Sequence, residues 1–156
     1  MHIPDGFIDL PTSAIFAAAS AGAITYSLVG ARKQLDEKSA PLAGLTAVFI
    51  FAVQMLNFPV AAGTSGHLLG GALAAVLVGP YAASLALTVV LVMQAFLFAD
   101  GGLSAIGLNV FNMSVLGVWG GYAVFLLVRK ILPKNKVSIS IAAATAGLIS
   151  VPIAAV

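Results

Sequence analysis

The sequence predicts an all-α integral membrane protein with about six transmembrane helices, folded as a single domain over residues 1–156. Two observations lead to this prediction. Of the 156 residues, 61% are hydrophobic and only 8% are charged, whereas about 25% of the residues in an ordinary soluble domain are charged. The apolar stretches are also continuous rather than alternating, and this pattern favours membrane-spanning helices over the strands of a barrel.

Turn residues separate the apolar runs and set the limits of each helix. The third run, from residue 65 to residue 98, is too long for one crossing, because residues 67–98 as one helix would measure about 48 Å. Gly79-Pro80-Tyr81 is the natural break within it. The short segment before this break must be partly buried in the bundle, since it cannot span alone. The predicted segments are residues 12–31, 41–58, 67–78, 82–98, 110–132 and 137–156.

The basic residues predict the orientation of the chain. They lie in two loops, one with Arg32, Lys33 and Lys38 and the other with Arg129, Lys130, Lys134 and Lys136. With a break at Pro80 both loops fall on the same side, which the positive-inside rule assigns to the cytoplasm. We therefore expect a multi-pass protein of the cell membrane, in contact with the lipid bilayer. Its N-terminus and the loops at residues 59–66 and 100–109 are expected on the outer side.

Several functional classes lack support in the sequence. The net charge of +2 is too small to indicate a nucleic-acid partner. Cysteine is absent, which excludes a thiolate metal site. There is no His-Glu-x-x-His sequence and no P-loop, and Ser65-Gly66-His67 is a poor match to a serine hydrolase. We expect a protein that is not an enzyme, so any ATP-driven step requires another chain.

The two histidines, His2 and His67, are both expected at the outer end of the bundle. The opening of the chain does not resemble a signal peptide, so Met1 is expected to remain. A histidine in second position offers three nitrogens to one metal ion: the amine of Met1, the deprotonated amide of His2 and the His2 ring. A nitrogen of His67 would complete a square, which suits Ni(II) or Cu(II), whereas zinc prefers a tetrahedron. The alternative for each histidine is an ordinary polar residue.

Other polar residues are expected to surround this site and orient its ligands, because amides and carboxylates at membrane depth are costly unless paired. The expected set is Asp5, Ser65, Asp100, Asn109 and Asn112. Two alternatives remain open: Asn109 caps the following helix, and residues 1–11 form an ordinary solvated leader. Gln54 and Gln94 are single polar residues within predicted spans, and they can bond neighbouring helices.

Three stretches carry a resemblance to a known family: residues 1–7 (MHIPDGF), residues 63–71 (GTSGHLLGG), and Gln94 through Asp100-Gly101-Gly102 to residues 109–113 (NVFNM). The chain resembles the CbiM/NikM family, the substrate-binding (S) component of energy-coupling-factor cobalt and nickel transporters. The resemblance implies a bundle of six or seven helices. In this family the N-terminal segment, residues 1–11 here, plugs the outer cavity, and Met1, His2 and His67 hold Ni(II) or Co(II) as the transported substrate, without an organic cofactor.

The resemblance also implies partners: a transmembrane coupling subunit, cytoplasmic ATPase subunits and a small accessory membrane subunit. Small residues on the first helix become candidates for the coupling face, and these are Ala14, Ala17, Ala18, Ala21 and Gly22. Packing within the bundle is the alternative for them. The chain is shorter than usual for the family, so a seventh helix is expected to be missing at its C-terminus.

Two other functions remain alternatives to metal capture. One is a haem-binding membrane subunit with His2 and His67 as axial ligands, and the other is a purely structural subunit of a membrane complex. The choice between nickel and cobalt is open at this point.

Overall fold

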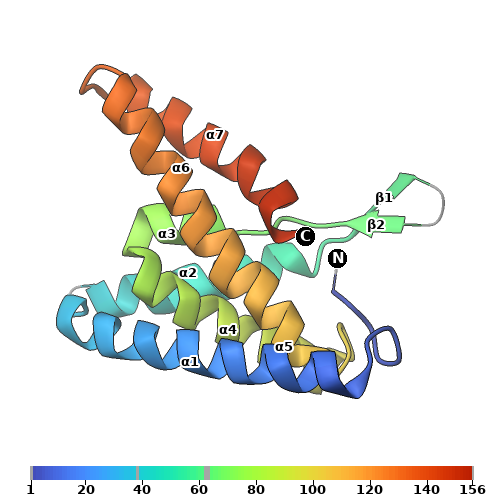
Figure 1. The fold of residues 1–156 in the computed structure, drawn as a ribbon. Coiled ribbons are helices and arrows are strands. Elements are labelled where there is room, and N and C mark those ends of the chain that lie inside the picture. Colours follow the sequence, from blue (N-terminus) through green and yellow to red (C-terminus); the bar gives the residue numbers. More distant parts are fainter. Residues whose placement is uncertain (1, 38, 62–63, 156) are drawn as a thin grey trace.

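The computed structural model describes residues 2–37, 39–61 and 64–155, which form a mostly helical bundle with one short hairpin of strands (Figure 1). The helices are α1 (Leu10–Gln34), α2 (Ser39–Gln54), α3 (Gly71–Val78), α4 (Pro80–Phe98), α5 (Ile106–Asn109), the π-helix η1 (Val110–Leu116), α6 (Gly117–Ile131) and α7 (Lys136–Ala154), and the strands are β1 (Phe58–Ala61) and β2 (Thr64–Gly66).

Four of the described helices are long and apolar enough to cross a membrane: α1, α4, the continuous helix Ile106–Ile131 and α7. Helix α2, with 16 residues, is apolar but shorter. Large apolar side chains such as Leu10, Phe96 and Leu148 are exposed on the surface of the bundle. Exposed apolar side chains at this density are typical of a surface that faces lipid rather than water. The chain is therefore an all-α membrane protein.

The long third run divides at Gly79, as the sequence predicts. Gly79 has φ of 80°, a conformation that glycine adopts without strain, and Pro80 stands at the first position of α4, where its missing N–H costs nothing. Helix α3 is shorter than predicted, because it begins at Gly71 rather than at residue 67. Gly70, with φ of 80°, ends the extended segment before it. His67 therefore lies in an extended loop and not on a helix.

The second predicted segment, residues 41–58, is wrong at its C-terminal end. Helix α2 ends at Gln54, and Phe58–Ala61 pairs as strand β1 with Thr64–Gly66, antiparallel. Pro59 explains the difference, because proline disfavours helical backbone in the residue before it and donates no backbone hydrogen bond. The hairpin leads the chain out of the bundle and back to His67 (Figure 1).

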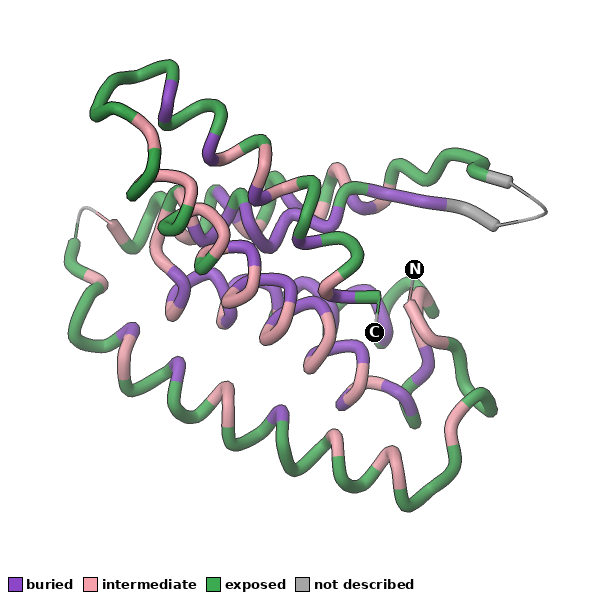
Figure 2. Tube along the Cα trace, turned by 45° about the horizontal axis from the view of Figure 1, so that its top comes forward, coloured by how far each residue is buried: buried purple, intermediate pink, exposed green. Residues whose placement is uncertain are grey.

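Helix α4 lies at the centre of the bundle, where it packs against α1, α2, α3 and η1. Figure 2 shows that the buried residues concentrate in α3, α4 and the helix that runs through η1, while α1 is exposed along much of its length. Ile50, Ala83, Leu87 and Val118 form one core cluster, and the described part of the chain adds a second around Leu91 and Met113.

Buried hydroxyl groups join α4 to the π-helix. Ser84 Oγ donates to the carbonyl of Ser114 at 2.9 Å, and Ser114 Oγ donates to the carbonyl of Ser84 at 2.6 Å. Thr88 Oγ1 lies 2.8 Å from Ser114 Oγ, and Trp119 Nε1 donates to Ser84 Oγ at 3.1 Å. A π turn alters the backbone pairing of the helix and needs local compensation. We refer to Ser84, Thr88, Ser114 and Trp119 as the hydroxyl network.

Candidate metal site

The N-terminal segment is bound along its backbone by the loop that follows α4. Ile3 N donates to Asn109 Oδ1 at 2.8 Å, and Asn109 Nδ2 donates to the carbonyl of Ile3 at 3.0 Å. Gly102 N donates to the same carbonyl at 2.9 Å. Asn109 is 3% exposed and stands at the end of α5, whose N-cap is Ala105. The alternative that Asn109 caps a helix is therefore wrong, since its side chain bonds the N-terminal segment instead.

The side chain of Asp5 binds the same segment to the loop after α4, through Ser104. Its Oδ1 accepts from Ser104 N at 2.7 Å and from Ser104 Oγ at 2.6 Å, and these hydrogen bonds lower the pKa of Asp5. Gly102 allows this close approach, because a Cβ at that position would lie 2.3 Å from Asp5 N and 2.6 Å from the carbonyl carbon of Pro4. Residues 2–5 are thus held by hydrogen bonds to residues 102–109, although Pro4 and Asp5 themselves are exposed.

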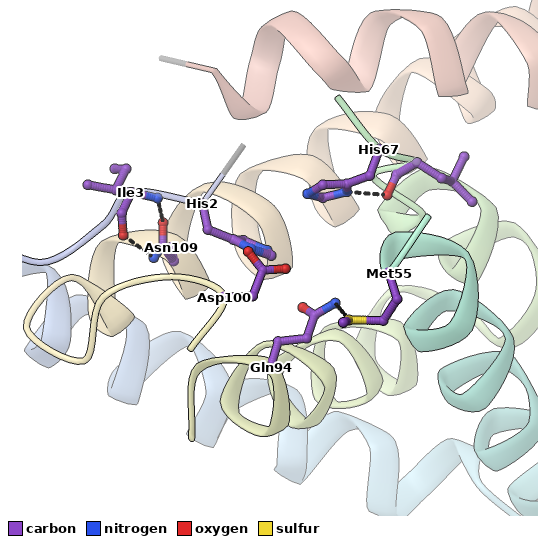
Figure 3. Close-up of polar contacts among 8 residues, drawn as sticks. His2, Ile3, Met55, His67, Gln94, Asp100 and Asn109 are labelled. Atoms are coloured by element: carbon purple, nitrogen blue, oxygen red, sulfur yellow. Dashed lines mark hydrogen bonds and ion pairs between the residues drawn. The ribbon is translucent and has the colours of Figure 1, made fainter. Parts of the chain in front are cut away.

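His2 points into the bundle and contacts Asp100 (Figure 3). Its Nδ1 lies 2.9 Å from Asp100 Oδ1, and its side chain is only 3% exposed. The turn after α4 presents this carboxylate: Ala99, with φ of 50°, and Asp100 both donate their backbone N–H to the carbonyl of Gln94. Because a carboxylate only accepts, the contact places a proton on Nδ1 of His2.

His67 comes from the extended loop between β2 and α3 and is 7% exposed. Its Nδ1 lies 2.9 Å from the carbonyl of Leu68, which only accepts, so Nδ1 carries the proton and Nε2 has a free lone pair. Burial lowers the pKa of His67 and favours the neutral imidazole. Gln54 Nε2 donates to the carbonyl of Leu69 at 2.7 Å and so anchors this loop to α2.

The two imidazoles meet although they are 65 residues apart in the sequence. Their ring centroids are 5.1 Å apart, and the planes are tilted by 41°. Nε2 of His2 and Nε2 of His67 are both buried without a hydrogen-bond partner among the described residues. A histidine whose Nδ1 is held by a carboxylate or a carbonyl, with Nε2 free, is typical of a metal ligand.

The structure brings together most of the predicted site residues but not all of them. His2, His67, Asp100, Asn109 and Asp5 lie at one end of the bundle, as described above. The side chain of Asn112 makes no hydrogen bond among the described residues, so its part in the site stays a prediction. Met1 and the side chain of Ser65 lie outside the described part of the chain. No group of three or more His, Cys, Asp or Glu side chains within that part is arranged to hold a metal ion.

Sequence reasoning did not assign Gln54, Met55 and Gln94 to the site. Gln94 and Met55 lie beneath the two imidazoles in Figure 3, with Gln94 Nε2 4.0 Å from Met55 Sδ. Both glutamines are completely buried, and each has an Oε1 without a partner among the residues that the structure describes. The available signal was a lone polar residue within an otherwise apolar run, and it predicts helix pairing as readily as a binding site.

The candidate coupling residues on α1 fall into two groups. Ala14, Ala18, Ala21 and Gly22 are exposed, and a Cβ at Gly22 would meet nothing within 4 Å. Ala17 is exposed as well, but its backbone packs on α5, because a Cβ at Gly107 would lie 2.5 Å from Ala17 Cα. Ala17 therefore contributes to packing within the bundle as well as to the exposed stripe.

Comparisons with known proteins show which family the chain resembles. A family model described as "Cobalt uptake substrate-specific transmembrane region" matches residues 2–156. The chain is 45% identical over 156 residues to a protein of Archaeoglobus fulgidus named "Putative fused nickel transport protein NikMN", and 33% identical over 131 residues to a Methanococcus voltae protein named "Putative cobalt transport protein CbiM". A solved structure described as that of a truncated transition metal transporter is 35% identical, with a TM-score of 0.89.

The chain spans only part of these proteins. It covers 50% of the Archaeoglobus protein and 59% of the Methanococcus protein, which match 100% and 83% of this chain respectively. The solved structure covers 99% of this chain, and 71% of that structure is covered in turn.

Proposed function

We propose, since the chain belongs to the family of cobalt uptake substrate-specific transmembrane regions, that it captures a nickel or cobalt ion as the substrate-binding subunit of an uptake transporter. The observation that carries the proposal is the close approach of two buried imidazoles from distant parts of the chain: the rings of His2 and His67 lie 5.1 Å apart, and His67 has an Nε2 without a hydrogen-bond partner among the described residues. Relatives are named for nickel and for cobalt transport, and imidazole suits such ions. The ion is substrate, and no chemical reaction of the protein is required.

In the proposed bound state the ion takes the amine of Met1, the amide and ring of His2, and Nε2 of His67. A ring that chelates together with the amide of its own residue must use Nδ1, because only Nδ1 lies close enough to that amide. Nδ1 of His2 contacts Asp100 in the structure, so capture exchanges this hydrogen bond for the metal. A divalent ion on one deprotonated amide keeps a single positive charge, which the carboxylate of Asp100 balances in a site of low dielectric constant.

For the membrane topology we propose about six segments with the N-terminus on the outer side. In this topology helix α3, with eight residues, runs from the outer side into the membrane, and α4 returns to the outer side. This arrangement leaves both basic loops on the cytoplasmic side. The proposed partners are a transmembrane coupling subunit, cytoplasmic ATPase subunits and a small accessory membrane subunit. The exposed stripe of Ala14, Ala17, Ala18, Ala21 and Gly22 permits close helix approach and is the proposed coupling face.

The test is isothermal titration of Ni(II) and Co(II) into the purified protein in detergent. The parent is compared with His67→Ala and with a variant that carries one extra residue before Met1. We expect one-to-one binding in the parent and a loss of about 100-fold or more in both variants. A Glu37→Gln variant, changed in the loop after α1, serves as the control and should bind as the parent does. Unchanged affinity in the two site variants, or no binding by the parent, would overturn the proposal.

A further inference from the structure

His2, His67, Asp100 and Gln94 surround a region that we call the chamber (Figure 3). Among the described residues, several hydrogen-bond acceptors in this chamber have no donor. Six buried side-chain nitrogen or oxygen atoms lack a partner within the described part of the chain. Four of them belong to residues that lie together in Figure 3: His2 Nε2, His67 Nε2, Asp100 Oδ2 and Gln94 Oε1. All four are acceptors, given the protons already placed on both Nδ1 atoms. A buried acceptor without a donor is destabilising, so this group of acceptors suits a bound cation.

Neither the sequence pattern nor the packing of the bundle explains why a glutamine stands at position 94. It is completely buried one turn before the end of α4. The same residue's backbone carbonyl accepts the N–H groups that set the turn carrying Asp100, so the two side chains are fixed relative to each other. Figure 3 shows the Gln94 amide beneath the imidazoles, with Oε1 on the side of Asp100 and Nε2 toward Met55. Oε1 therefore faces the chamber.

A comparison with Gln54 separates a packing role from a ligand role. Gln54 is equally buried, but its Nε2 donates to the carbonyl of Leu69 at 2.7 Å, and this strong bond anchors the loop of His67. Nε2 of Gln94 has only the thioether of Met55, at 4.0 Å, which is a weak acceptor. A leucine would fill the same space without burying an unsatisfied amide. Packing alone therefore accounts for Gln54 and not for Gln94.

We propose that Gln94 Oε1 supplies a fifth ligand to the bound ion, from below the square of nitrogens, and that this ligand favours Co(II) over Ni(II). The inference rests on the proposed function. Four nitrogen ligands that include a deprotonated amide suit square-planar Ni(II), which gains little from an axial oxygen. Co(II) accepts a fifth ligand and is stabilised by it. Met55 acts as a positioning residue, because its sulfur accepts from Nε2 and so turns Oε1 toward the chamber.

The experiment measures the Ni(II) and Co(II) dissociation constants by competition, together with the visible spectrum of the Co(II) complex. The variants are Gln94→Leu, Gln94→Glu and Met55→Leu, with Thr88→Val as a control on the same helix. In Gln94→Leu we expect Co(II) binding to weaken about tenfold relative to Ni(II), with a shift of the Co(II) spectrum on loss of the fifth ligand. Gln94→Glu retains an oxygen and should preserve the spectrum. Met55→Leu should change both readouts less, in the direction of Gln94→Leu, and Thr88→Val should change neither.

Equal weakening of both metals in Gln94→Leu, or an unchanged ratio and spectrum, would overturn the inference while the proposed function stands. Absence of binding in the parent would instead defeat the proposed function. If Gln94→Leu does not fold, as judged by thermal unfolding, Gln94→Met serves in its place, because methionine keeps the length and flexibility of the side chain without its oxygen.

Discussion

The bundle contains two buried polar regions that differ in one respect. In the hydroxyl network of Ser84, Thr88, Ser114 and Trp119, each side chain has a hydrogen-bond partner at 3.1 Å or less. In the chamber around His2 and His67, four acceptor atoms have none within the described residues. Complete pairing indicates a structural role, whereas a set of bare acceptors indicates a site that a ligand completes. The comparison predicts that changes in the first region affect stability and that changes in the second affect binding.

The largest expected effect comes from Gly102→Val, which acts on the chamber without touching a proposed ligand. The new side chain would collide with Pro4 and Asp5 and displace the N-terminal segment. We expect Ni(II) affinity to fall about 100-fold, as measured by titration. Gly22→Ala is the matched control, because a Cβ there meets nothing within 4 Å. Normal affinity in Gly102→Val would show that the binding of residues 2–5 to the loop is not required.

The reverse case is Ser84→Ala in the hydroxyl network. This substitution removes a donor to the carbonyl of Ser114 and an acceptor for Trp119 Nε1. We expect the free energy of unfolding to fall by about 1–3 kcal/mol, with metal affinity unchanged. Thermal unfolding in detergent measures the first quantity and titration the second. A large loss of affinity at unchanged stability would break the distinction between the two regions.

A smaller effect is expected from pH, through His67. Burial lowers its pKa below the reference value of 6.5, so the unfolded chain binds this proton more readily than the folded chain does. Stability therefore falls as the pH drops through 6.5 and becomes constant again below the folded pKa. His67→Gln should reduce this pH dependence of the unfolding temperature between pH 7.5 and pH 5, measured without metal. An unchanged slope in His67→Gln would mean that the titration of His67 does not contribute.

Much of this architecture is predictable from the sequence, for identifiable reasons. The break at Gly79-Pro80 follows from helix length and proline chemistry. The positions of the basic loops predict the topology, and that topology places both histidines at the same end of the bundle. The hairpin at residues 58–66 is not predicted, since a run of apolar residues looks the same in a strand and in a helix. The pairing of Asn109 with Ile3 depends on a contact across 106 positions, which no local pattern contains. Gln94 gives only the ambiguous signal of a lone amide in a span.

The rigid course of α4 has a mechanical consequence. This single helix extends from Tyr81, which contacts α1 through Tyr26, to the turn that presents Asp100. Its 19 residues form a shaft about 28 Å long. A tilt of about 5° around the Tyr81 end would move the Asp100 end by about 2.5 Å, given that length. Such a displacement is nearly as long as the 2.9 Å contact between His2 and Asp100. Under the proposed function, a small movement of α4 at the Tyr81 end would therefore be enough to break this contact and release the ion.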